Sequence, residues 1–83
     1  MEDLQEALQL ANEHERMLGT VCRQIAICYV EEAPLETIDA EIGWCSYNTL
    51  YSRLYRYILN TYPETYIDPR KLMCYMDYAY DIA

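Results

Sequence analysis

The sequence predicts an all-α fold, a small single-domain bundle of three long helices and one short helix over residues 1–83. Only two glycines and three prolines occur in the chain, too few for the frequent turns of a β-sandwich or barrel. Apolar residues make up 53% of the sequence, which is enough to form a core. Two separate cores would each be smaller than the roughly 40 residues below which a chain usually needs metal or disulfide support.

The longest predicted helix runs from Glu2 to Glu32. Its apolar residues recur every three or four positions, the spacing of one helix face. The residues expected to face the core are Leu4, Leu8, Ala11, Leu18, Cys22, Ile25 and Tyr29. Gly19 can end a helix and Thr20 can cap the next one, so the sequence is compatible with one kinked helix or with two short helices.

A short second helix is predicted between Pro34 and Gly43. Proline suits the first position of a helix because its missing N–H would have no partner there, and glycine commonly follows the last turn. Three apolar residues form one stripe on this helix, namely Leu35, Ile38 and Ile42.

Two helices with clear start signals follow. Ser46 is a good N-cap for a helix that ends near Thr61 before Pro63, with Tyr47, Leu50, Tyr51, Leu54 and Ile58 on its inner face. Asp68 is an N-cap with Pro69 at the first helical position, and this last helix is expected to bury Leu72, Met76, Ala79 and Tyr80.

The chain is acidic, with 14 Asp and Glu residues, six Lys and Arg residues, and a net charge of −8. Residues 1–43 contain ten of the acids and only two arginines, so the acidity is concentrated in the first half. A surface of this charge repels phosphate backbones and anionic membranes. Direct binding of nucleic acid or of a membrane is therefore not expected.

The first candidate site is an acidic face. Five carboxylates occur within eleven residues that contain no base, and helical carboxylates three or four positions apart lie ~5–6 Å from one another, a spacing comparable to that of successive phosphates. We expect a partner-binding face formed by Glu13, Glu15, Glu31, Glu32, Glu36, Asp39 and Glu41. The alternative is a solvated helix face that keeps the domain soluble.

The second candidate is a set of tyrosines. The chain has ten tyrosines and no phenylalanine, and a core this small cannot give ten hydroxyls buried partners. Because tyrosine is enriched at protein interfaces, we expect exposed, partner-binding rings at Tyr55, Tyr57, Tyr75 and Tyr78. The alternative is that these rings pack at the margin of the core.

The third candidate is a helix-turn-helix. The segment PLETIDAEIGWCSYNTLYSRL (34–54) resembles the helix, glycine turn and recognition helix of bacterial repressors. In that family the recognition helix lies in the major groove. The resemblance implies a DNA-binding regulator that reads bases with Ser46, Tyr47, Asn48 and Arg53.

Residues for catalysis are scarce. His14 is the single histidine and lies between two glutamates that point in other directions on a helix, so no acid–base pair is predicted. No CxxC pair and no phosphate-binding glycine loop occur. We therefore expect a protein that is not an enzyme and has no cofactor and no metal. The absence of a signal segment or of a run of ~20 apolar residues predicts a cytoplasmic protein, in the host cytoplasm if the source is viral.

These observations favour a non-enzymatic inhibitor that docks on the basic surface of a partner, and we expect that partner to be a nucleic-acid-binding protein. In size and charge, and in nothing more specific, such a chain resembles phage and viral inhibitors of host defence, anti-CRISPR proteins among them. The DNA-binding regulator is one alternative. The other is a self-associating structural or adaptor protein, a homodimer whose seam lies on Met73, Tyr75 and Tyr78 of the last helix.

Overall fold

Three α-helices and one short 3₁₀ helix make up the fold of the computed structural model, which describes residues 2–39, 42 and 44–80, with side chains from residue 4 onward. The order is α1 (Glu2–Val30), η1 (Leu35–Thr37), α2 (Tyr47–Thr61) and α3 (Pro69–Ala79). No strand occurs within these residues, so the predicted all-α class is confirmed, with three α-helices in place of four. Among the described helices, none is long and apolar enough to cross a membrane.

The first helix is continuous through Gly19, which decides between the two alternatives left by the sequence. Gly19 lies on the exposed side of α1, and a Cβ atom placed there would meet nothing within 4 Å. The Thr20 hydroxyl donates to the carbonyl oxygen of Arg16, 3.1 Å away, which is the usual bond of a threonine inside a helix. Thr20 is therefore not a cap.

The short helix predicted between Pro34 and Gly43 is shorter than expected, because among the described residues of this segment only Leu35–Thr37 is helical, as one 3₁₀ turn. Ile38 is already extended, with φ −74° and ψ 118°. The extended path lets Ile38 and Ile42 reach the core, and the Ile42 N–H donates to the Ala79 carbonyl oxygen at the end of α3 (3.3 Å). The Ile42 N–H is thus bound to a carbonyl oxygen of α3, and not to a carbonyl oxygen one helical turn earlier in its own segment. Gly43, the expected helix stop, lies outside the described residues.

Both strong start signals are confirmed. The Ser46 side chain accepts a hydrogen bond from the Thr49 N–H (3.2 Å), and α2 begins at the next residue. Asp68 accepts from the Arg70 N–H (3.1 Å), and Pro69 opens α3. Each cap supplies an acceptor for a backbone donor that has no partner within its helix.

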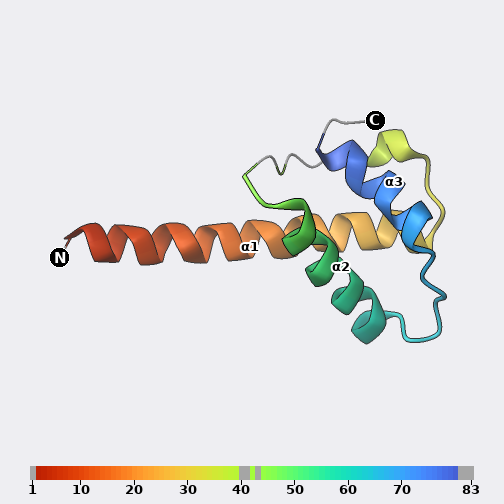
Figure 1. Cartoon of the computed structure of the whole chain (residues 1–83), viewed down its shortest axis with the longest axis horizontal. Helices are drawn as coiled ribbons and strands as arrows, with labels where there is room; N and C mark the ends of the chain where they lie inside the picture. The colour runs from red at the N-terminus through yellow and green to blue at the C-terminus, as the bar shows by residue number, and fades with distance from the viewer. Residues whose placement is uncertain (1, 40–41, 43, 81–83) are drawn as a thin grey trace.

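The core lies where the second half of α1 meets α2 and α3 (Figure 1). Its fully buried large side chains come from every part of the chain after residue 24: Ile25, Ile42, Leu50, Leu54, Ile58, Leu72 and Met76. The inward faces predicted for α2 and α3 are largely confirmed, with Tyr47, Tyr51 and Tyr80 half-buried at the margin.

The first half of α1 projects away from this core as an arm, defined here as residues 4–17 (Figure 1). Every side chain of the arm is exposed except that of His14, which is half-buried. The predicted burial of Leu4, Leu8 and Ala11 is therefore wrong, and Leu4 is 65% exposed. The apolar spacing continues from the core into the arm, but α2 and α3 pack only against the later turns of α1.

Candidate functional site

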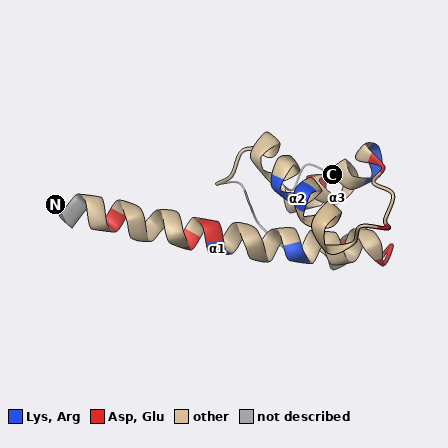
Figure 2. Cartoon of the chain, turned by 90° about the horizontal axis from the view of Figure 1, so that it is seen from below, with Lys and Arg blue, Asp and Glu red and all other residues tan. Residues whose placement is uncertain are grey.

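The described members of the acidic face are all exposed: Glu13, Glu15, Glu31, Glu32, Glu36 and Asp39. They do not form the helical row that the sequence predicted, because among the described residues after Pro34 only Leu35–Thr37 is helical and Ile38 is extended. Two lie in the middle of α1, and the others lie at or beyond its C-terminal end. Figure 2 shows acidic residues at both places and basic residues on α2. Glu41 lies outside the described residues.

Two of these carboxylates form ion pairs within the chain. Glu15 of α1 pairs with Arg53 of α2, and Glu32 pairs with Lys71 of α3 at 3.0 Å. The hydrogen bond to Glu32 raises the pKa of Lys71. The remaining carboxylates form no ion pair with any described residue, namely Glu13, Glu31, Glu36 and Asp39. Four of the acidic side chains are thus available to an external base.

Glu32 also has a structural role at the end of α1. Its φ is 55°, in the left-handed region that glycine usually occupies at a helix C-terminus. The Ala33 N–H bonds to the Cys28 carbonyl oxygen (2.9 Å) and the Glu32 N–H to that of Tyr29 (3.2 Å), the pattern of a Schellman motif. Glu32 therefore contributes to the fold through its left-handed backbone and its ion pair with Lys71, and a substitution there would change more than the surface charge.

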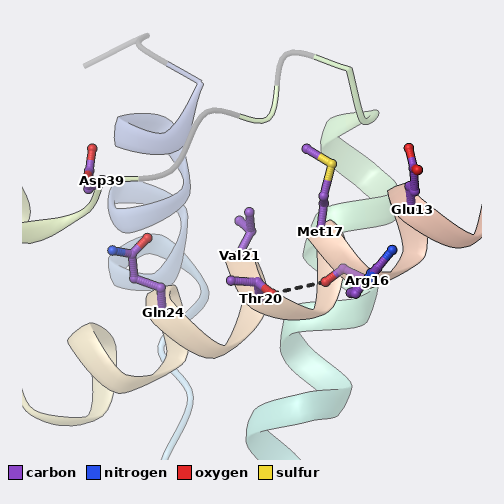
Figure 3. A pocket seen from close by; sticks show the side chains of 7 residues that line it. All are labelled: Glu13, Arg16, Met17, Thr20, Val21, Gln24 and Asp39. Atoms are coloured by element: carbon purple, nitrogen blue, oxygen red, sulfur yellow. Dashed lines mark hydrogen bonds between the residues drawn. The ribbon is translucent and has the colours of Figure 1, made fainter. Parts of the chain in front are cut away.

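A groove of about 520 Å³ lies along one side of α1. Met17 and Val21 form its apolar floor, with Arg16, Thr20 and Gln24 beside them, and the side chains of Glu13 and Asp39 stand at its two ends (Figure 3). The sequence placed both acids on one face but gave no sign of the groove, because Asp39 reaches this side of α1 only through the extended segment after η1.

Of the four tyrosines predicted to be exposed, one is exposed, and its role in partner binding stays a prediction. Tyr55 is exposed, whereas Tyr57 and Tyr78 are half-buried. Tyr75 is only 5% exposed, so its predicted place on the surface is wrong. Its hydroxyl donates to the Ala33 carbonyl oxygen at 2.8 Å, and its ring meets the Tyr29 ring edge-on at 5.9 Å. Tyr75 is also the central residue of the dimer seam predicted on α3, and because it is buried it cannot contact a second copy.

Loop carbonyls explain how tyrosine hydroxyls can be buried in so small a core. The Tyr29 hydroxyl donates to the Tyr66 carbonyl oxygen (3.1 Å) and accepts from the Asp68 N–H (2.7 Å). The Tyr80 hydroxyl donates to the Cys45 carbonyl oxygen (2.6 Å). Because these acceptors belong to loops, each bond satisfies a backbone group that has no helical partner. The sequence predicted that a core this small could not provide ten such partners, and nothing in it indicated that loop carbonyls would serve.

The residues expected to read DNA are mostly engaged within the chain. Ser46 caps α2, the Tyr47 hydroxyl donates to Asp77 at 3.0 Å, and Arg53 pairs with Glu15. Asn48 is exposed. The first helix of the motif is replaced by the three residues of η1. The two-helix arrangement that would present a recognition helix is therefore absent from the described part of the chain.

His14 stacks on Trp44, with ring centroids 5.0 Å apart and an angle of 21° between the rings. This contact ties the base of the arm to the segment before α2. All four cysteines are free thiols, of which Cys22 and Cys28 are buried. Burial raises the pKa of Cys22 to about 11, so this thiol is a poor nucleophile at neutral pH.

Within the described residues, no three His, Cys, Asp or Glu side chains come together in a way that could hold a metal ion. The chemistry that the described side chains do offer is that of exposed carboxylates beside an apolar groove. Comparisons with protein-family models, with curated proteins and with solved structures give no match to this chain.

Proposed function

We propose that this chain is a non-enzymatic inhibitor whose acidic face docks on a basic, nucleic-acid-binding surface of a partner protein and blocks that surface. One observation carries the proposal: Glu13, Glu31, Glu36 and Asp39 are exposed and form no ion pair with any described residue. Lysines and arginines of a partner can therefore bind them without first breaking a pair inside this chain.

A net charge of −8 attracts a basic surface over about the Debye length, ~8 Å at physiological salt, and speeds its encounter with the chain. Complementary charges then favour the basic partner over acidic ones. A partner that evolved to hold phosphates offers such a surface, and carboxylates on it compete with nucleic acid.

Nothing in the structure favours the DNA-binding alternative. Arg53 and Lys71, two of the six basic residues, are held in ion pairs with Glu15 and Glu32. A duplex would have to approach a chain that is acidic overall and in which, among the described residues, only Leu35–Thr37 of the motif's first helix is helical. In a viral or phage setting, in the host cytoplasm, the inhibitor would act on a defence protein of the host, as anti-CRISPR proteins do.

The test is affinity capture from a nuclease-treated extract, followed by mass spectrometry. The tagged wild-type chain should retain a nucleic-acid-binding protein. Glu31→Gln combined with Glu36→Gln should lose most of that protein, because two unpaired carboxylates of the acidic face become neutral. Glu6→Gln combined with Glu64→Gln is the matched control, since it removes the same charge from exposed positions outside the face.

Circular dichroism must show the same helix content for all three proteins. Equal capture by the wild type and by both double variants would contradict a role of the acidic face. Capture of DNA alone from a parallel extract that has not been treated with nuclease, and its loss from the treated extract, would contradict the proposal and favour the helix-turn-helix alternative.

A further inference from the structure

We infer that the groove along α1, between Glu13 and Asp39, is the seat of an amphipathic helical segment of the partner that has an apolar centre and a basic residue toward each end. The inference rests on the proposed function and names the part of the partner that this chain recognises. From Glu13 to Gln24, α1 rises about 16 Å, a length that three turns of a partner helix would cover.

The floor of the groove is apolar and continues onto the arm. Met17 is 47% exposed, and Val21 lies one turn further toward the core. Leu10, at 53% exposed, lies seven residues before Met17 and so falls on the same face two turns earlier. At the inner end of this strip Val21 (8% exposed) packs into the core, whereas Leu10 and Met17 leave much of the strip exposed. Covering it would remove apolar surface from water, which is the main source of affinity in most protein complexes.

The ends of the groove select for positive charge. Glu13 and Asp39 stand at opposite ends, both exposed and without an ion pair in the described part of the chain (Figure 3). Arg16 is the one base among the lining residues, so the lining has a net negative charge. Two basic side chains flanking an apolar centre would match it, whereas an acidic segment would be repelled.

The same charges argue against a second copy of this chain as the occupant. Each copy has a net charge of −8, so a homodimer would bring two acidic surfaces together. Arg53 and Lys71, which could offset that repulsion, already pair with Glu15 and Glu32. A basic partner segment covers the apolar strip without this cost.

The test uses a defined probe, a fluorescein-labelled 14-residue peptide with leucine at the a and d positions of two heptads and lysine elsewhere. Binding is followed by fluorescence anisotropy at fixed salt. Leu10→Ser combined with Met17→Ser should weaken binding by about tenfold or more. Leu59→Ser combined with Met73→Ser is the matched control, because Leu59 (47%) and Met73 (41%) are similarly exposed outside the groove. It should change the affinity less than about twofold.

A scrambled peptide of the same composition separates charge from shape, since it keeps every lysine but has no apolar face. It should bind the wild type about as weakly as the intact peptide binds the Leu10 and Met17 double variant. Leu10→Ser alone, on the exposed arm, should give part of the loss, and it serves if the double variant has an altered circular dichroism spectrum.

Three outcomes would overturn the inference. Equal effects of the two serine double variants would place the peptide elsewhere. Loss of binding in Glu13→Gln combined with Asp39→Asn, but none in Leu10→Ser combined with Met17→Ser, would leave the acidic face as a docking surface and remove the groove from it. A wild-type dimer by light scattering that dissociates in the Leu10 and Met17 variant would make a second copy the occupant.

Discussion

The Tyr75 hydroxyl donates a hydrogen bond of 2.8 Å to the carbonyl oxygen of Ala33. Tyr75 lies in the middle of α3, and Ala33 follows the turn that ends α1. The bond therefore joins two parts of the chain that are 42 residues apart and holds the start of the segment that leads to Asp39. We therefore expect loss of this bond to lower the free energy of unfolding of the whole domain.

Tyr75→Phe should lower the free energy of unfolding by about 1–2 kcal/mol, because it leaves a part-buried carbonyl without its partner. For a domain of this size that corresponds to a fall in Tm of ~4–8 °C for each kcal/mol. Tyr66→Phe, at a ring that is 83% exposed, should change stability by less than about 0.5 kcal/mol. Urea denaturation measures both, and equal values would contradict the assigned role.

Leu54→Ala should cost about 2–5 kcal/mol, because Leu54 is fully buried where α1 and α2 meet. Leu8→Ala on the arm should change stability by less than about 0.5 kcal/mol, since the leucine is exposed and alanine is the better helix former. Denaturation curves followed by circular dichroism give both values. A large cost for Leu8→Ala would mean that the arm is packed against something in solution.

Stability should fall at alkaline pH. Burial, helped by the hydrogen bond to Asp77, raises the pKa of Tyr47 from 10.0 to about 12, and burial with the nearby Cys45 raises the pKa of Tyr80 to about 12. The folded chain thus holds these protons more tightly than the unfolded chain. Their contribution is fully present below pH 10 and is lost as the pH rises from 10 to 12.

Unfolding measured between pH 8 and 12 should show this fall, with Cys22 adding to it from about pH 9 because burial raises its pKa from 9.0 to about 11. Tyr47→Phe combined with Tyr80→Phe should make the fall between pH 10 and 12 shallower. Tyr66→Phe should leave its steepness unchanged. A profile that is the same in all three proteins would refute the assignment to Tyr47 and Tyr80.

The four thiols should react at different rates with a disulfide reagent at pH 8. Cys74 is exposed and should react first. Cys45 is half-buried and burial raises its pKa, so it should follow more slowly. The buried thiols of Cys22 and Cys28 should react only when the chain unfolds. Rapid titration of all four without denaturant would show that the core is open.

Local signals in the sequence predicted those parts of the fold that depend on a few neighbouring residues. The Ser46 and Asp68 caps are such signals, and both helices start where they indicate. The helix predicted after Pro34 is shorter than expected because a contact with a distant part of the chain determines the backbone conformation there. That contact is the hydrogen bond from the Ile42 N–H to the Ala79 carbonyl oxygen at the end of α3. Apolar spacing alone could not distinguish these two outcomes.

In the arm, a regular apolar pattern predicts burial that does not occur. Leu4, Leu8 and Ala11 continue the spacing of the buried residues of α1, so their pattern predicts burial, but α2 and α3 lie beside the later turns of α1 (Figure 1) and leave these residues exposed. The described members of the acidic face are exposed as expected, whereas the groove between Glu13 and Asp39 depends on the path of the chain after η1 and has no sequence signal.

The most direct test of the central claim is displacement of nucleic acid from the captured partner. Labelled DNA or RNA bound to that partner is titrated with this chain, and its fluorescence anisotropy is recorded at several salt concentrations. The account predicts that anisotropy falls to the value of the unbound nucleic acid, and that more of the chain is needed as salt screens the carboxylates. Anisotropy that stays constant or rises would show that partner, nucleic acid and chain bind together, and would contradict a blocking role.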